Sequence, residues 1–272
     1  MSFHSPLPPN VMRHHDLFKY RPLRHDKGEE HEHTRSIFEH KALWFARPAS
    51  FNDPFDCDLR MLMGHVPEHL LEAACVAVAK EHPRLSKKAV ERLVRKLTKK
   101  PRAFDHILEE KRRVIREDSS VCCWAGNGVS VTMYGYYADS HHGICLQFRI
   151  EHRHQLGQVL PVNYVPDYPK LNYGDLARDP DLAKYLMFTK AQTWEHEEER
   201  RVFRYDEREG RVNFEPQQLV RIIFGVKCSD HDIGMVKNWI NNWPCPVVLA
   251  RAKAQEAAFA LRIVDFETVG DD

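Results

Sequence analysis

The sequence predicts an α+β fold, with a mixed or antiparallel sheet as its core and a helical insertion. Segments with strand character occur in runs near both ends of the 272-residue chain, and helical periodicity is concentrated between them, over residues 67–117. Separate runs of strands and helices are typical of α+β proteins, whereas α/β proteins alternate the two. No repeat or low-complexity linker divides the chain, so we expect a single domain over residues 1–272.

The composition is that of a protein with a packed core. Hydrophobic residues make up 43% of the chain and charged residues 29%, which excludes general disorder. The longest apolar runs, such as residues 219–226, are too short to cross a bilayer, and the first ten residues are polar with three prolines. Seven cysteines without a CxxC pair indicate reduced thiols. We therefore expect a cytoplasmic protein without a membrane partner.

The first elements are expected before residue 64. Residues 17–21 and 42–46 have the composition of short strands, and residues 36–41 that of the end of a helix. The segment Phe51-Asn52-Asp53-Pro54-Phe55-Asp56 follows, and its Asn, Asp and Pro content predicts a turn.

Helices are expected next, over the insertion. Residues 68–81 are rich in Ala and Leu, and Ser86 can cap a helix with apolar residues at helical spacing between positions 89 and 97. A third helix is expected over residues 104–115. Residues 80–117 hold 14 basic and 6 acidic side chains, although the whole chain has a formal charge of only +1. This charge is either a solvated helical surface or an attraction for nucleic acid or an acidic partner.

Strands return after residue 120. Apolar and polar residues alternate over positions 144–150, which predicts a strand with one buried face. Further strands are expected at residues 121–124, 158–165, 201–205, 219–225, 246–251 and 260–266. Helices are expected at residues 179–191 and, capped by Ser229, at residues 230–241.

Three motifs hold the candidate site residues. In the turn, Asn52, Asp53 and Asp56 either form a rigid corner or bring a carboxylate into a site. In the segment 133–146, Tyr134 and Tyr137 lie three residues apart and can share a helical face. Together with His141 they either line a pocket for a flat ring or belong to the core.

The third motif, Trp194-Glu195-His196-Glu197-Glu198-Glu199-Arg200-Arg201, leads into a strand. Because side chains alternate along a strand, Glu197 and Glu199 are expected on one face, suited to acid/base work or to stabilising a positive transition state. Arg201 continues that face and can neutralise the pair, which is the structural alternative.

Other enzyme classes lack their motifs here. The chain has no Gly-rich phosphate loop, no G-x-S-x-G and no HExxH, which excludes Walker NTPases, α/β-hydrolases and zincins. We expect no metal at the site.

Four segments, in this order, make the chain resemble a bacterial domain family of unknown function. These are residues 18–21, the Phe51–Asp56 turn, the Tyr137-Ala138-Asp139-x-His141-x-Gly143-Ile144-Cys145 segment, and the Trp194-x-x-Glu197-x-Glu199-x-Arg201 motif. Tyr134 stands where that family usually has Trp. The character of the family implies an effector in bacterial conflict or phage defence.

A weaker similarity connects the chain to mono-ADP-ribosyltransferases, through the order Arg21, Ser130-Val131-Thr132 and Glu197-x-Glu199. The resemblance implies an ADP-ribosyltransferase-like fold and NAD as the small-molecule ligand. Arg21 would anchor the dinucleotide and Ser130 would brace the site. Glu199 would hold the ribose hydroxyl and stabilise an oxocarbenium-like state, while Glu197 would activate a protein or nucleic-acid acceptor.

Two other functions stay open on the sequence. One is a non-catalytic module that binds a nucleotide or a protein. The other is a metal-dependent nuclease that uses Asp53, Asp56, Glu197 and Glu199. For the fold we expect one sheet system containing Tyr20, Trp44, Cys122, Ile144, Leu146, Phe148, Val202 and Ile222. For the site we expect Arg21, Glu197, Glu199 and the Tyr134–His141 segment in a single cleft.

Overall fold

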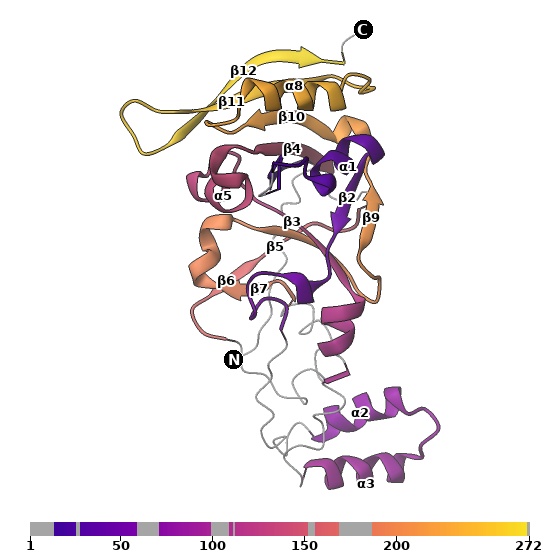
Figure 1. Cartoon of the computed structure of the whole chain (residues 1–272). Helices are drawn as coiled ribbons and strands as arrows, with labels where there is room; N and C mark the ends of the chain where they lie inside the picture. The colour runs from indigo at the N-terminus through magenta and orange to yellow at the C-terminus, as the bar shows by residue number, and fades with distance from the viewer. Residues whose placement is uncertain are drawn as a thin grey trace.

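A five-stranded mixed sheet forms the largest layer of the protein in the computed structural model (Figure 1). The structure describes residues 14–25, 28–58, 71–98, 109–110, 112–151, 156–168 and 187–270. The strand order is β1-β4-β10-β11-β12, and only the β10–β11 pair is parallel. The strands are β1 His14–Arg21, β4 Ile144–Glu151, β10 Leu219–Phe224, β11 Val247–Ala254 and β12 Leu261–Val269. The predicted α+β class with a mixed sheet core is confirmed.

The parallel pair is connected through helix α8, Asp230–Trp239. A parallel connection needs a crossover, and a helix is its usual form. Ser229 caps α8 as expected, since its hydroxyl accepts a hydrogen bond from the Asp232 amide at 3.1 Å.

Smaller sheets lie beside the large one. They are the three-stranded sheet β3-β8-β5 and the pairs β2-β9 and β6-β7. Their bounds are β2 Ala42–Phe45, β3 Ser120–Trp124, β5 Leu160–Pro161, β6 Asn163–Val165, β7 Thr189–Ala191, β8 Arg200–Arg204 and β9 Gly210–Asn213. Isolated bridges join Phe18 to Ala125 and Ala46 to Val121. The expectation of one sheet system is therefore wrong for Trp44, Cys122 and Val202: all three lie on strands, but on these smaller sheets.

The core lies on both faces of the large sheet. Alternate residues of β4 point to opposite faces, so Ile144, Leu146 and Phe148 pack in the main cluster with α8, while Cys145 packs in a second cluster with Tyr134. Helix α1, Glu32–His40, adds to the main cluster, and helix α5, Val131–Tyr137, adds to the second. Short 3₁₀ helices lie at Pro48–Ser50, Asp139–His141, Gln192–Glu197 and Pro216–Gln218.

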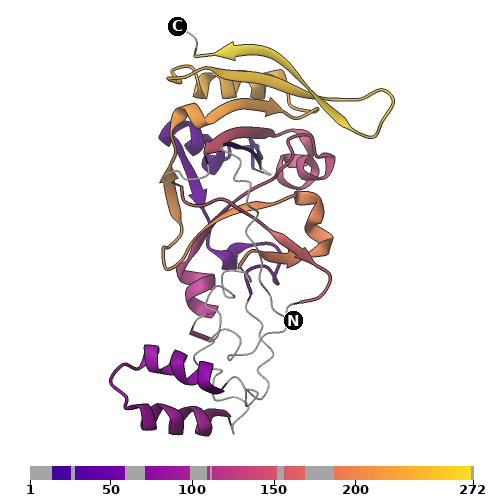
Figure 2. The same ribbon diagram turned by 180° about the vertical axis from the view of Figure 1, so that it is seen from behind.

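Two helices from the insertion form a hairpin at the end of the molecule opposite β12 (Figure 2). They are α2, Leu71–Glu81, and α3, Lys87–Thr98, and the Ser86 hydroxyl accepts a hydrogen bond from Ala89 as a cap should. Of the third expected helix, residues 104–108 and 111 lie outside the described part; residues 109–110 and 112–113 are helical, and a π-helix follows at Val114–Asp118. Within the described residues, no helix is long and apolar enough to cross a membrane.

Two predicted elements need correction. The strand expected at residues 158–165 is broken into β5 and β6, which pair with different neighbours, β8 and β7. The helix expected at residues 179–191 ends instead in strand β7. Residues 179–186 of that prediction lie outside the described part.

Candidate functional site

Five charged side chains meet in the interior between β7, β8 and the Phe51–Asp56 turn. We call them the ionic cluster: Asp56, Lys190, Glu197, Glu199 and Arg201. None of the five side chains is more than 6% exposed. Charged groups at this depth are stable only when they are paired and hydrogen-bonded.

Arg201 holds two of the carboxylates. Its guanidinium donates to both oxygens of Asp56, at 2.8 and 2.6 Å, and to both oxygens of Glu199, at 2.7 and 2.9 Å. A further bond goes to the Met187 carbonyl at 3.0 Å. The planar fork of arginine fits such bidentate pairs, and here it is saturated.

Lys190 lies where all three carboxylates converge. Its Nζ is 2.5 Å from Glu197 Oε2, 3.1 Å from Glu199 Oε2 and 3.5 Å from Asp56 Oδ2. Glu197 has no contact with Arg201, and its other oxygen accepts a hydrogen bond from the Tyr137 hydroxyl at 2.7 Å. Three carboxylates against two cations leave the cluster with one formal negative charge, and Glu197 is the carboxylate that Arg201 does not neutralise.

Local backbone chemistry brings these side chains together. Asp53 Oδ1 accepts a hydrogen bond from the Phe55 amide at 2.9 Å, the self-bonding expected of this turn, and Asp56 thereby faces β8. The interpretation of Asp53 as a rigid corner is thus the one that its contacts favour.

Glu197 and Glu199 converge because of the local backbone conformation, and not because side chains alternate along a strand. Glu197 ends a 3₁₀ helix, Glu198 has a left-handed backbone with φ of 48°, and β8 begins only at Arg200. The prediction that Glu197 and Glu199 share a strand face is wrong. The reversal at Glu198 turns both side chains inward while Glu198 itself stays exposed.

Two opposing effects set the pKa values in the ionic cluster: burial disfavours the charged form of each group, and pairing with groups of opposite charge favours it. Burial raises the pKa of Glu199, but the Arg201 charge and hydrogen bonds, together with Lys190, outweigh it and lower that pKa to about 2. Burial acts to lower the pKa of Lys190, yet Glu199, Asp56 and Glu197 together raise it above its usual range. Burial of Tyr137, followed by the adjacent Glu197 charge, raises the pKa of its hydroxyl. Glu199 and Lys190 are therefore charged at neutral pH, and Tyr137 is a neutral donor.

Four aromatic side chains, two exposed and two half-buried, lie close to one another beside the ionic cluster. We call Tyr136, Tyr137, Trp194 and His196 the aromatic rim. Ring centroids lie 6.4 Å apart for Tyr136 and Tyr137 and 6.1 Å apart for Tyr136 and His196. Asn52 adds a polar group beside the Tyr137 hydroxyl, where it opposes the upward shift of the Tyr137 pKa. The ring of Trp194 covers the Lys190 ammonium at 5.0 Å. Flat rings above a buried carboxylate can hold a planar cationic ligand.

Two predicted site residues lie elsewhere. Arg21 ends β1 and contacts Thr34, with Nε to Oγ1 3.4 Å, and among the described residues no contact joins it to Tyr137 or the carboxylates. Ser130 caps α5, since its hydroxyl accepts from the Met133 amide at 3.3 Å. The expected cleft shared by Arg21, Glu197 and Glu199 is not present.

Tyr134 belongs to the core rather than to a pocket, and His141 is half-buried against it. Tyr134 is fully buried, its ring lies at right angles to that of Tyr20 with the centroids 4.9 Å apart, and its hydroxyl donates to the Ile223 carbonyl at 3.3 Å. The ring of His141 stacks on Tyr134 at 5.8 Å. The full burial of Tyr134 leaves no surface of its ring for a ligand. Of this motif only Tyr137 reaches the site.

Sequence reasoning missed Lys190 and Tyr164. The Tyr164 hydroxyl accepts a hydrogen bond from the Glu199 amide at 2.7 Å. Lys190 was hidden in a segment expected to be helical, whereas its strand β7 points it at the glutamates. The sequence does contain a signal for Lys190, because this lysine lies seven residues before Glu197 and shortly before Trp194 of the third motif.

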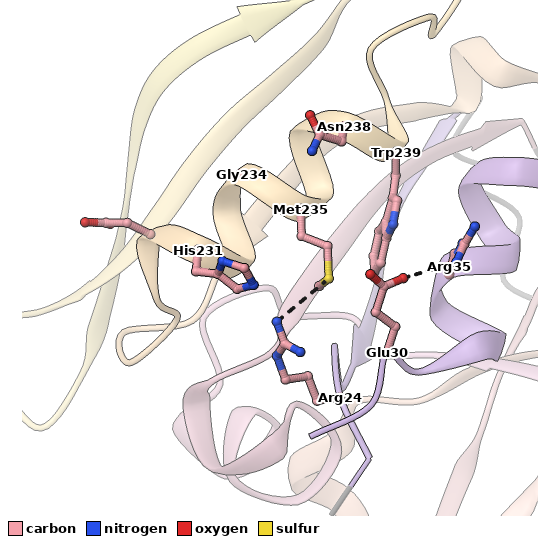
Figure 3. Close-up of a pocket in the computed structure, with 9 residues that line it drawn as sticks. Arg24, Glu30, Arg35, His231, Gly234, Met235, Asn238 and Trp239 are labelled. Atoms are coloured by element: carbon pink, nitrogen blue, oxygen red, sulfur yellow. Dashed lines mark hydrogen bonds and ion pairs between the residues drawn. The ribbon is translucent and has the colours of Figure 1, made fainter. Parts of the chain in front are cut away.

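A separate hollow of about 580 Å³ lies between α8 and the segment before α1 (Figure 3). Arg24 and Arg35 line it, but Arg24 is paired with Asp232 at 2.6 Å and Arg35 with Glu30 at 3.3 Å. None of the residues of the four motifs borders this hollow. The ionic cluster is therefore the stronger candidate site.

No family model, curated protein or solved structure matches the chain significantly. Its resemblances to the bacterial domain family and to mono-ADP-ribosyltransferases stay predictions from the motifs.

Proposed function

We propose that the ionic cluster and aromatic rim bind the cationic nicotinamide end of NAD and promote cleavage of its glycosidic bond. The observation that carries the proposal is the formal net negative charge of a buried cluster in which Glu197 is the one carboxylate that is not bonded to Arg201. A buried net charge is costly, and a ligand of opposite sign removes that cost. The pyridinium ring of NAD is such a ligand, and it is flat enough for the rim.

The reaction would need only electrostatic help from the protein. As the bond between nicotinamide and the ribose carbon breaks, its electron pair leaves with the neutral nicotinamide, and positive charge develops on the ribose. A fixed carboxylate stabilises that charge more than it stabilises the ground state, which is how preorganised groups accelerate reactions. A nucleophile, either water or an acceptor side chain or base, then bonds to the ribose carbon.

In the proposed reaction, Glu197 and Glu199 differ in role from what the ADP-ribosyltransferase resemblance implies. Glu199 is saturated by Arg201 and Lys190, so it acts as a positioning residue. Glu197 faces the rim and takes the role of stabilising the ribose cation. Lys190 and Tyr137 hold the Glu197 carboxylate in place, one on each oxygen. Only 4% of the Glu197 side chain is exposed, so the substrate would reach it by moving the rim rings.

A metal-dependent nuclease is less well supported by the donor set. The oxygens of Asp56 and Glu199 are already bonded to Arg201, and the Lys190 ammonium lies at the point that a cation would take. The reduced state of the thiols fits a cytosolic enzyme, because all seven cysteines are unpaired.

The test is nicotinamide release from NAD by the purified full chain. Glu197→Gln should lower the rate about 100-fold or more, as loss of one charge-stabilising group does elsewhere. Glu195→Gln is the matched control, because Glu195 is exposed in the same 3₁₀ helix and should leave the rate unchanged. Equal rates for Glu197→Gln and the wild type would contradict the proposal.

Binding supplies an independent measurement. NAD should bind more tightly than NADH, because the dihydronicotinamide ring of NADH carries no positive charge. Glu197→Gln should abolish that preference. Binding of NAD without any release of nicotinamide would favour a non-catalytic module, and equal affinities for NAD and NADH would overturn the electrostatic argument.

A further inference from the structure

Helix α3 is strongly basic in a protein that is nearly neutral overall. Its twelve residues contain five cations, Lys87, Lys88, Arg92, Arg95 and Lys96, and one carboxylate, Glu91. The backbone segment Lys87–Thr98 is helical throughout, and all five cationic residues are exposed. A local charge of this size creates a field that attracts polyanions.

The cations follow one side of the helix. Lys88, Arg92 and Lys96 are spaced by four residues, so they lie above one another on a single face. At 1.5 Å per residue they follow each other at about 6 Å along the axis. The opposite face carries Val90 and Val94, which are 3% and 0% exposed.

Four of the five cations on α3, Lys87, Lys88, Arg92 and Lys96, differ from other exposed cations of the protein in their ion pairs. Arg113 is paired with Glu110 and Asp118, and Arg35 with Glu39 and Glu30. Among the described residues, no carboxylate lies within ion-pair distance of Lys87, Lys88, Arg92 or Lys96. Their charge is therefore available to a partner.

The packing of the hairpin identifies the kind of partner. Val90 and Val94 of α3 are buried, as is Val78 of α2, and the two helices lie side by side (Figure 1). A helix that inserts into a membrane surface or a protein groove uses its apolar face, which is not available here. The hairpin residues 71–98 contain no Phe, Tyr or Trp that could stack on bases. What remains is recognition of regularly spaced negative charge.

We propose that the exposed face of α3 docks on the phosphate backbone of nucleic acid, without regard to sequence. Lys88, Arg92 and Lys96 make the central contacts, and Lys87 and Arg95 border them. The hairpin lies at the end of the molecule opposite β12, away from the other described helices and strands (Figures 1 and 2). The inference is independent of the NAD site.

Fluorescence anisotropy with the full chain and a labelled mixed-sequence duplex of about 20 base pairs tests the proposal, with DNA and RNA duplexes as separate arms. Each phosphate contact contributes about 0.9 to the slope of log affinity against log salt for DNA. Three contacts therefore imply a loss of about 40-fold in affinity between 50 and 200 mM salt. The triple variant Lys88→Gln, Arg92→Gln, Lys96→Gln should lower that slope by about 2.7.

The control removes the same charge elsewhere. Arg211, Lys253 and Arg262 are exposed on β9, β11 and β12, and their replacement by Gln should leave binding close to that of the wild type. Glu91→Gln gives an effect of opposite sign, since it removes the carboxylate of α3 and should tighten binding. Thermal melts confirm that each variant is folded.

Three results would overturn the proposal. The wild type could fail to bind either duplex at 50 mM salt, or the triple variant could bind as tightly as the wild type. In the third, the wild type binds neither duplex but sediments with vesicles of phosphatidylserine and phosphatidylcholine. That result would assign the basic face of α3 to anionic membranes instead.

Discussion

Asp56 and Arg201 lie 145 residues apart in the chain and form a buried bidentate pair, with Oδ1–Nη1 2.8 Å and Oδ2–Nη2 2.6 Å. The Arg201 side chain has no exposed surface. The pair fastens the Phe51–Asp56 turn to strand β8, so two motifs that are remote in sequence become one structural unit. Loss of either partner leaves the other charge buried, which costs far more than the pair itself contributes.

Arg201→Gln should therefore lower the free energy of unfolding by about 3–5 kcal/mol. The variant leaves Asp56 and Glu199 without their shared cation, and Lys190 alone faces three carboxylates. Urea denaturation followed by circular dichroism measures the change, with the m-value checked for constancy.

Arg204→Gln is the matched control on the same strand. Arg204 is paired with the half-exposed Glu207 at 2.7 Å, and a surface pair of this kind contributes about 0–1 kcal/mol. A loss below 1 kcal/mol for both variants would mean that the ionic cluster is not a stabilising element of the fold.

The fold was predictable from sequence where the pattern is local. Alternation over residues 144–150 places β4, and Ser86 and Ser229 mark the starts of α3 and α8, because caps and period-two patterns act over a few residues. The division into several sheets was not predictable. Whether β3 pairs with β1 or with β8 depends on contacts between distant segments, which no local pattern contains.

The candidate site shows the same limit. Glu197 and Glu199 do converge, but through a 3₁₀ helix and a left-handed Glu198 rather than along a strand. Tyr134 and Tyr137 are alike in sequence, yet one lies in the core and the other at the site, because the sheet covers only one side of α5. Lys190 depends on β7, whose pairing with β6 is set by the tertiary structure.

Loss of charge at Glu199 should lower the stability of the protein much more than loss of charge at Glu197. Glu199→Gln removes the charge that Arg201 and Lys190 hold in place, so stability should fall by about 2–4 kcal/mol, within the range for breaking buried pairs. Either variant leaves two carboxylates with two cations, but Glu197→Gln breaks only the contacts of Glu197 with Lys190 and Tyr137 and leaves both bidentate pairs of Arg201 intact. The stability of Glu197→Gln should change by less than about 1 kcal/mol or rise.

Paired urea titrations of the two variants check this. A matched loss of stability in both would show that Glu197 is a structural partner of Lys190 on the same footing as Glu199. That result would also remove the main support for the NAD proposal, since the proposal depends on Glu197 being the carboxylate that Arg201 does not neutralise.

Ser130→Ala separates a cap from a ligand contact. The Ser130 hydroxyl accepts from Met133 at the start of α5, and losing such a cap costs about 1 kcal/mol. The melting temperature should fall, while the affinity for NAD should stay within about twofold of the wild type. A loss of affinity with unchanged stability would restore Ser130 to the site, as the ADP-ribosyltransferase resemblance implies.

His31 should make stability depend on pH above the range in which carboxylates titrate. Its ring stacks on His25 at 4.4 Å and lies 5.8 Å from His33 at the start of α1. Burial, then the charges of Arg21, His25 and His33, lower the pKa of His31 to about 4 from 6.5. The folded protein thus favours neutral His31, and the unfolded chain binds the extra proton. Stability should fall as the pH drops from about 6.5 to about 4, whereas the lowered pKa of Glu199 acts only below about 4.5.

Thermal melts of the wild type and His31→Asn at intervals between pH 7 and pH 4 test this. Asparagine cannot titrate and is itself a good residue at a helix N-cap, the position of His31 in α1, so the variant should lose less stability over that range. His231→Asn, exposed on α8, removes a histidine without touching the stack and should keep the wild-type profile. If His31→Asn and the wild type lose the same stability between pH 6.5 and 4.5, the dependence belongs to other groups, and the stack at the start of α1 does not respond to protonation.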